Sequence, residues 1–157
     1  MSRAASRKEI EITKDLTIPK LFLQSARKYW DKKVAMREKE FGIWTPITWK
    51  QYYDNVKHIA LGMVSLGVER GDRVAMIGDN RPEALWAEMA TMCVGGVGIW
   101  LFHDSLIDEV QYIMNHSDAK LMVGEGQCHS PSPAPSGCLE SFICFTWPSP
   151  PGNASLI

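Results

Sequence analysis

Three short apolar segments alternate with two amphipathic ones between residues 73 and 123, and this alternation restricts the possible folds more than any other feature. The apolar segments 73–77, 97–102 and 121–123 have the length of strands, and the second of them is expected to be a buried strand. The segments between them carry apolar residues at helical spacing. Because two consecutive strand–helix–strand units give a parallel sheet with helices on its faces, we expect an α/β fold with a partial, mostly parallel sheet and flanking helices.

The segment before this alternation predicts two helices and a pair of short strands. Apolar residues recur at helical spacing over 18–30, and strand-like segments follow at 34–36 and 43–47, joined by a polar turn. Thr48 and Gln51 then have the spacing of a capping box, which indicates that a long helix begins there. We therefore expect a helix, two short strands and a second helix before the first strand of the sheet.

Several residues are typical of helix ends. Gly67 follows the long helix where a left-handed C-terminal cap is needed. Asn80 can cap the next helix, with Pro82 in its first turn. Ser105 has capping spacing for the last helix. The inward face of that last helix is expected to consist of Ile107, Val110, Ile113 and Met114.

The carboxyl ends of the predicted strands mark where a site would lie, because open α/β sheets bind ligands beyond those ends. The corresponding loops are 78–80, 102–104 and 124–125. His103 and Asp104 leave a strand end, where catalytic groups often sit. Two adjacent polar residues at such a place also form an ordinary turn, and we favour the turn.

The other candidate groups have simpler structural interpretations. The glycine-rich run 95–98 precedes a strand and lacks a following Lys-Ser/Thr pair, so it indicates helix termination and close packing instead of phosphate binding. His116 suits the negative end of a helix dipole, and Asp108 and Glu109 suit the positive end. His58 belongs to a helix surface. We therefore predict that this chain carries no catalytic, cofactor-binding or metal-binding residue.

Charge and apolar length exclude two classes of partner. The formal net charge is -1, and basic residues are interleaved with acidic ones, which argues against a nucleic-acid binder. The longest apolar run, 93–102, is about half the length that a membrane span needs. The N-terminus has no apolar signal segment, and no C-x-x-C pair occurs, so we expect a reduced, cytoplasmic setting. The cysteines are Cys93, Cys128, Cys138 and Cys144.

Composition changes abruptly near residue 127. Six of the nine prolines lie in 128–157, together with a single charged residue, Glu140. We therefore expect a disordered segment 1–16, an ordered part 17–127 and an irregular, unstructured Pro/Ser-rich tail 128–157. The tail could bind a domain that recognises proline-rich ligands, although it lacks the usual flanking basic residue. Alternative splicing, a shifted reading frame or an incomplete gene model would explain its composition.

Four ordered segments carry a resemblance to a known family. They are 41–49, 66–75, 80–83 and 108–120, and the likeness extends over 17–125. In order and spacing they resemble the N-terminal portion of AMP-forming acyl-CoA synthetases, in particular the long-chain fatty acid–CoA ligase branch of the adenylate-forming superfamily.

This resemblance implies an enzyme that couples a carboxylic acid to coenzyme A through an acyl-adenylate, with ATP, Mg²⁺ and CoA as reactants and cofactors. It also implies a fatty acid substrate and a location that is cytoplasmic or peripheral to a membrane. The phosphate-cradling loop and the catalytic lysine of such enzymes do not occur in this sequence. His103, Asp104 and Ser105 also depart from the family pattern at their loop. No catalytic, cofactor or metal residue is therefore transferred to this chain.

Three hypotheses follow for the chain itself. It is a truncated ligase fragment, or truncated isoform, that is inactive alone. Alternatively, it is a non-catalytic interaction or regulatory fragment that pairs with an intact acyl-CoA synthetase through an unfinished sheet edge. A poorly folding by-product is the third.

Overall fold

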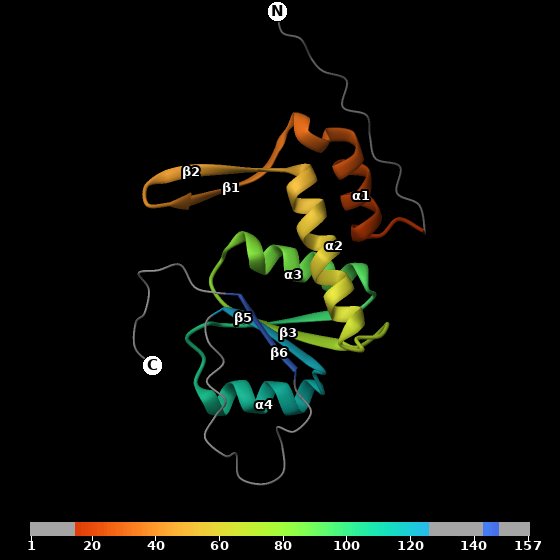
Figure 1. The fold of residues 1–157 in the computed structure, drawn as a ribbon. Helices are drawn as coiled ribbons and strands as arrows, with labels where there is room; N and C mark the ends of the chain where they lie inside the picture. Colours follow the sequence, from red (N-terminus) through yellow and green to blue (C-terminus); the bar gives the residue numbers. More distant parts are fainter. Residues whose placement is uncertain (1–14, 126–142, 148–157) are drawn as a thin grey trace, which may run out of the picture.

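A computed structural model describes residues 15–125 and 143–147 of the chain (Figure 1). Its helices are α1 (Ile18–Tyr29), the short 3-10 helix η1 (Trp30–Lys32), α2 (Trp49–Ser65), α3 (Pro82–Cys93) and α4 (Ile107–Ser117). Its strands are β1 (Val34–Glu40), β2 (Ile43–Thr48), β3 (Arg73–Ile77), β4 (Val97–Leu101), β5 (Leu121–Glu125) and β6 (Ile143–Trp147).

A parallel sheet with strand order β4-β3-β5-β6 forms the centre of the molecule. Strand β3 pairs with β4 on one side and with β5 on the other, and all pairings in this sheet are parallel. Helix α3 connects β3 to β4, and helix α4 connects β4 to β5 on the opposite face (Figure 1). The expected α/β fold with a mostly parallel sheet and flanking helices is confirmed.

The larger core lies between this sheet and helices α1, α2 and α3. Alternation along β3 and β5 directs one set of side chains to this face, because successive residues of a strand point to opposite sides. This face of the two strands contributes Val74, Met76, Leu121 and Val123, each at most 1% exposed. The helices contribute Phe22, Val56, Met63, Ala87 and Ala90.

A smaller core lies on the other face, under helix α4. The alternate residue Ala75 of β3 is fully buried there, with Leu101 of β4 and Met114 of α4. Strand β3 is therefore covered on both faces, as parallel strands usually are.

Strands β1 and β2 form an antiparallel hairpin that projects away from the parallel sheet (Figure 1). Phe41 and Gly42 form its two-residue turn, with φ values of 48° and 82°. Positive φ at both central residues is what a type I′ turn requires. Both strands are longer than the sequence predicted, because cross-strand pairing extends regular structure up to the turn.

Both predicted ends of helix α2 are confirmed. The hydroxyl oxygen of Thr48 accepts a hydrogen bond from the Gln51 backbone at 3.3 Å, and the Gln51 side chain accepts one from Thr48 N at 2.8 Å. At the other end, Gly67 has a φ of 83°. Val68 N donates to Met63 O and Gly67 N to Val64 O, which together make a Schellman motif.

Two predicted helix starts are wrong by one residue. Helix α3 is capped by Arg81, not Asn80, because the residue before Pro82 is excluded from helical geometry and Arg81 is extended at φ -116°, ψ 161°. Helix α4 is capped by Leu106, not Ser105. Ile107, expected to point inward, is 78% exposed because the helix begins there.

Two expectations about strands also need correction. Strand β4 is not a buried strand: it forms one edge of the sheet, and Val97 and Trp100 are 53% and 44% exposed. Strand β6 lies within 128–157, where we expected no regular structure, and it pairs with β5 from Leu121↔Ile143 to Glu125↔Trp147. The rest of that expected tail, and residues 1–14, lie outside the described residues.

Candidate functional site

The strand order β4-β3-β5-β6 reverses at β3, so the topological switch point of the sheet lies between the carboxyl ends of β3 and β5. The chain leaves β3 toward helix α3 on one face and leaves β4 toward helix α4 on the other. Both loops leave the carboxyl end of the sheet, which is the end where open α/β sheets bind ligands. The sequence predicted that any site would border the loops 78–80, 102–104 and 124–125, but residues 124–125 belong to strand β5 and form no loop.

The structure brings Asp79 and His103 together at the carboxyl ends of β3 and β4, beside this switch point. His103 Nδ1 lies 3.9 Å from Asp79 Oδ1, and the two side chains are 65% and 58% exposed. Asp104, next to His103, is also exposed. Because water screens such exposed groups, their attraction contributes little to stability. The pair can still present a proton donor and a carboxylate to a ligand at the sheet edge.

Arg81 joins the projecting hairpin to the start of helix α3. Its guanidinium lies 3.1 Å from Glu38 Oε1 on β1 and 3.5 Å from Glu83 Oε2 on α3. The Arg81 side chain is 19% exposed and each carboxylate side chain is 24% exposed. This partly buried bridge has a structural explanation, because it fixes the hairpin against the body of the protein.

A small cavity of about 210 Å³ lies between α2, α3 and β5. Its lining includes Asn55 and His58 on α2, Glu83 and Trp86 on α3, and Val123 on β5. Trp86 Nε1 is buried and donates no hydrogen bond to any described residue. A buried donor without a partner is costly, so a water or a polar ligand atom in this cavity would be stabilised there. Sequence patterns missed this cavity because α2, α3 and β5 are distant in sequence.

A larger, apolar hollow of about 470 Å³ lies among helices α1, α2 and the end of α3. Phe22, Val56 and Leu61 contribute apolar lining, and Lys57 stands among them. Cys93 also lines it, and partial burial raises the pKa of its thiol. Because the thiolate is the reactive form, this shift makes Cys93 less nucleophilic at neutral pH.

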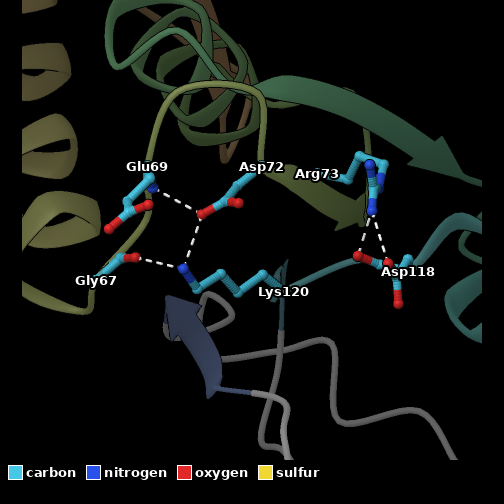
Figure 2. Close-up of polar contacts among 6 residues, drawn as sticks. All are labelled: Gly67, Glu69, Asp72, Arg73, Asp118 and Lys120. Atoms are coloured by element: carbon cyan, nitrogen blue, oxygen red, sulfur yellow. Dashed lines mark hydrogen bonds and ion pairs between the residues drawn. The ribbon is translucent and has the colours of Figure 1, made fainter.

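A polar network ties the opposite, amino end of the sheet together (Figure 2). Lys120 Nζ donates to Gly67 O at 2.6 Å and to Asp72 Oδ2 at 2.9 Å. Asp72 Oδ2 also accepts from Glu69 N at 2.7 Å. Beside it, Arg73 donates to the Asp118 carboxylate at 2.8 Å. The network links the end of α2 and the turns that precede β3 and β5.

The other sequence candidates occupy structural positions. Gly95, with a φ of 81°, ends helix α3, and a Cβ at Gly96 would lie 3.1 Å from Asp72 O. The glycine run therefore serves helix termination and close packing, as predicted. Glu109 accepts a hydrogen bond from Leu106 N at the start of α4, and His116 stacks on Tyr112 at the other end.

Metal-ligating clusters and membrane-spanning helices are both absent from the described residues. Within 15–125 and 143–147, no group of three or more His, Cys, Asp or Glu side chains could hold a metal ion. No helix in that part of the chain is both long and apolar enough to span a membrane.

Comparison with known proteins identifies the family. Residues 22–141 match the family described as AMP-binding enzyme. The chain belongs to this family. The match includes the switch point, the amino-end network and all of the predicted resemblance segments. It also extends past residue 127, where the resemblance was expected to end.

Curated relatives of this family member are CoA ligases. The chain is 30% identical over 112 residues to the long-chain-fatty-acid–CoA ligase ACSBG2 of Xenopus laevis, covering 71% of this chain and 15% of the relative. It is 34% identical over 105 residues to 4-hydroxybutyrate–CoA ligase 2 of Metallosphaera sedula, covering 67% of this chain and 18% of the relative. The chain therefore spans less than a fifth of the length of these proteins.

Solved structures confirm the fold of this AMP-binding family member. The crystal structure of IdnL1 superposes with a TM-score of 0.68 at 19% identity, covering 86% of this chain and 26% of IdnL1. Together, the family match and the CoA-ligase relatives show that the chain resembles the N-terminal region of AMP-forming acyl-CoA ligases. Its four resemblance segments contain strand β2 with the preceding turn, the turn between α2 and β3, the start of α3 and most of α4.

Proposed function

We propose that this chain is the N-terminal scaffold of a long-chain fatty acid–CoA ligase and that it does not catalyse acyl adenylation alone. The observation that carries this proposal is the family match over 22–141 in a chain that spans 15% of a long-chain-fatty-acid–CoA ligase. Within a complete enzyme, these residues would build one part of the adenylate-forming domain. The chain would then be a truncated form of such an enzyme.

ATP, Mg²⁺ and CoA are the cofactors and reactants that the family resemblance implies for the complete enzyme. The described residues of this chain do not fit Mg²⁺, because they hold no cluster of carboxylates that could ligate it. They do not fit a phosphate group at the glycine run either, because Gly96 packs against Asp72 O and Thr91. We therefore assign no catalytic, cofactor-binding or metal-binding residue and derive no reaction step through these groups.

The role of this chain in such an enzyme is to position its switch point. The cores on both faces of β3 fix the loops that carry Asp79 and His103. Arg81 holds the hairpin against α3 at the same end of the sheet. In a complete adenylate-forming domain, the side chains of Asp79 and His103 would face the segment of that domain that packs against the carboxyl end of the sheet. Orientation of a neighbouring segment is thus the contribution that the scaffold makes.

An exchange assay tests the proposal directly. Purified chain is incubated with ATP, Mg²⁺, radiolabelled pyrophosphate and a long-chain fatty acid, and incorporation of label into ATP is measured. We expect no incorporation above a boiled sample, because the nucleotide-binding elements are missing. A complete long-chain ligase in the same buffer is the positive control. Incorporation by the isolated chain, with loss on His103→Ala, would refute the proposed incompetence.

A second candidate function rests on the exposed edge of the sheet. Strand β4 has no neighbour on its outer side among the described strands, and Val97, Trp100 and Phe102 are 53%, 44% and 81% exposed. Unpaired edge strands with apolar residues tend to recruit other chains. The chain would then be a non-catalytic regulatory fragment that pairs with an intact synthetase in the cytoplasm.

Co-purification discriminates between these candidates. A tagged chain is expressed with an untagged complete ligase, and retention of the ligase is compared with that by Trp100→Glu, which places a charge at the edge. Retention that Trp100→Glu abolishes supports pairing. A monodisperse monomer that retains no ligase eliminates the regulatory function and leaves the scaffold proposal standing.

A further inference from the structure

The turn of the β1–β2 hairpin carries a residue that is poorly suited to its backbone. Phe41 has a φ of 48°, in the left-handed region that bulky residues rarely adopt. Asn or Gly is the usual residue at this position of a type I′ turn. Phe41 is also 80% exposed, so packing offers almost no compensation for the strain. An uncompensated outlier of this kind points to a function outside the fold itself.

Two further large apolar side chains follow the Phe41–Gly42 turn at the tip of the hairpin. Ile43 is 70% exposed and Trp44 is 61% exposed, so the tip presents three large apolar residues to solvent. The hairpin projects beyond the helices and the parallel sheet (Figure 1). Exposed large apolar side chains gathered at the end of a hairpin mark an interaction site more often than an ordinary protein surface does.

Charge is segregated between the two faces of the hairpin. Directly opposed residues of an antiparallel pair share a face, and the register pairs Lys39 with Trp44 and Arg37 with Pro46. One face therefore carries two cations beside the indole, with Lys39 Nζ 5.8 Å from the Trp44 ring centre. Glu38 alternates onto the other face, where Arg81 neutralises it.

This combination fits an anionic lipid surface. Trp and Phe partition into the headgroup region, and Lys and Arg beside them reach the lipid phosphates and carboxylates. The whole chain has a net charge of -1, so attraction to anionic lipid must come from a local face such as this one.

We propose that the β1–β2 hairpin inserts Phe41 and Trp44 into the headgroup region of an anionic bilayer, with Arg37 and Lys39 contacting the lipid headgroups. The contact is peripheral and reversible, because only a few side chains enter the bilayer. The proposal is independent of ligase chemistry, since the hairpin can bind lipid whether or not the chain supports adenylation.

Co-sedimentation with vesicles tests the apolar half of the proposal. The full chain is mixed with phosphatidylcholine vesicles that contain about one third phosphatidylserine. We expect Phe41→Asn to lower the partition coefficient at least about tenfold, because a large apolar side chain is lost from the interface. Phe102→Asn is the matched control: Phe102 is 81% exposed but follows strand β4, outside the hairpin, and its loss should leave partitioning unchanged.

Charge variants test the other half. Lys39→Gln should weaken binding to the anionic vesicles about fivefold and leave the weak binding to pure phosphatidylcholine unchanged. Lys57→Gln changes the net charge by the same amount on helix α2 and should have no effect. Equal effects of the two lysine variants would overturn the proposal, because binding would then depend on net charge alone.

Thermal unfolding separates lost binding from lost structure. Asn tolerates positive φ, so Phe41→Asn should raise the unfolding midpoint by a few degrees while it weakens lipid binding. The proposal would be overturned if the unmodified chain bound neither kind of vesicle. Equal binding by Phe41→Asn and the unmodified chain would also overturn it. Binding of the hairpin to single-stranded RNA in place of vesicles, weakened by the same variants, would also overturn it.

Discussion

Asp72 shows how a single side chain can hold together segments that are distant in sequence. Its carboxylate accepts from Glu69 N, within its own turn, and from Lys120 Nζ, 48 residues away (Figure 2). The backbone hydrogen bond from Glu69, followed by the bond from Lys120, lowers the pKa of Asp72. The same contact with Asp72 raises the pKa of Lys120. Each charge therefore favours the folded state at neutral pH.

The signs of these two shifts predict how stability depends on pH. Because its pKa is lowered on folding, Asp72 stabilises the fold above its usual value of 3.8, and this is lost as the pH falls through the folded value. Because its pKa is raised, Lys120 stabilises the fold below 10.5, and this is lost as the pH rises through the folded value. Asp72→Asn should therefore be less stable than the unmodified chain at pH 7.

Urea unfolding at a series of pH values checks this prediction. The difference between Asp72→Asn and the unmodified chain should shrink as acid protonates Asp72. Asp54→Asn is the matched control, because Asp54 forms an exposed pair with Lys50 at 2.7 Å within one helix. That variant should change stability by less, since exposed pairs of this kind contribute only about 0.3–0.5 kcal/mol. A difference for Asp72→Asn that is constant with pH would contradict the assignment.

At the scale of single elements, helix α2 has both ends sealed by its own sequence. The capping box of Thr48 and Gln51 satisfies backbone N–H groups at the start, and the Schellman motif at Gly67 satisfies carbonyl groups at the end. Helix α2 packs between α1 and α3 above the sheet (Figure 1). Its stability therefore bears directly on the larger core.

Removing the N-cap of α2 should measurably lower the stability of the protein. Thr48→Ala should lower the free energy of unfolding by about 1 kcal/mol, because the Gln51 backbone N–H loses its acceptor. Ser65→Ala is the control: its hydroxyl bonds only to Gly62 O, within an already closed helix turn. Chemical denaturation of both variants gives the comparison. Equal losses would mean that the hydroxyl of Thr48 has no capping role.

The sequence predicted a helix end correctly where the stabilising contact joins residues only a few positions apart. The box at Thr48 and the glycine at Gly67 act within a few residues, so both were predictable from spacing. The starts of α3 and α4 were misassigned by one residue. At Pro82 the steric restriction on the preceding residue outweighs the preference of Asn80 for a cap. At α4 the effective signal is Glu109, which reaches back to Leu106 N.

At the scale of the whole molecule, the strand order determines what the sequence could not show. The apolar composition of β4 predicted burial, but its place at the sheet edge leaves Trp100 half exposed. Strand β6 has no alternating pattern, and only its pairing with the distant β5 defines it. The approach of Asp79 to His103 was predictable from parallel topology alone. The cavity at Trp86 was not, because it depends on how three elements pack.

Amide hydrogen exchange tests the four-stranded sheet. In a parallel sheet, alternate residues of a strand bond to opposite neighbours, so half of the β5 amides depend on β3 and half on β6. We expect slow exchange at consecutive amides from Leu121 to Glu125, because both neighbours are present. Amides of β4, an edge strand, should alternate between slow and fast exchange and serve as the internal reference. Alternation within β5 would show that β6 does not pair there.

The reach of Lys120 back to Gly67 has a consequence for how the protein is made. A ribosome releases the residues of α2 well before it releases Lys120, which lies 53 residues further along. During that interval the Gly67 carbonyl and the Asp72 carboxylate cannot yet bond to Lys120 and are hydrated by water instead. The hydrogen bonds of Lys120 at the amino end of the sheet therefore form late in biosynthesis. A nascent chain halted at helix α4 would leave this end of the sheet exposed to chaperones and proteases.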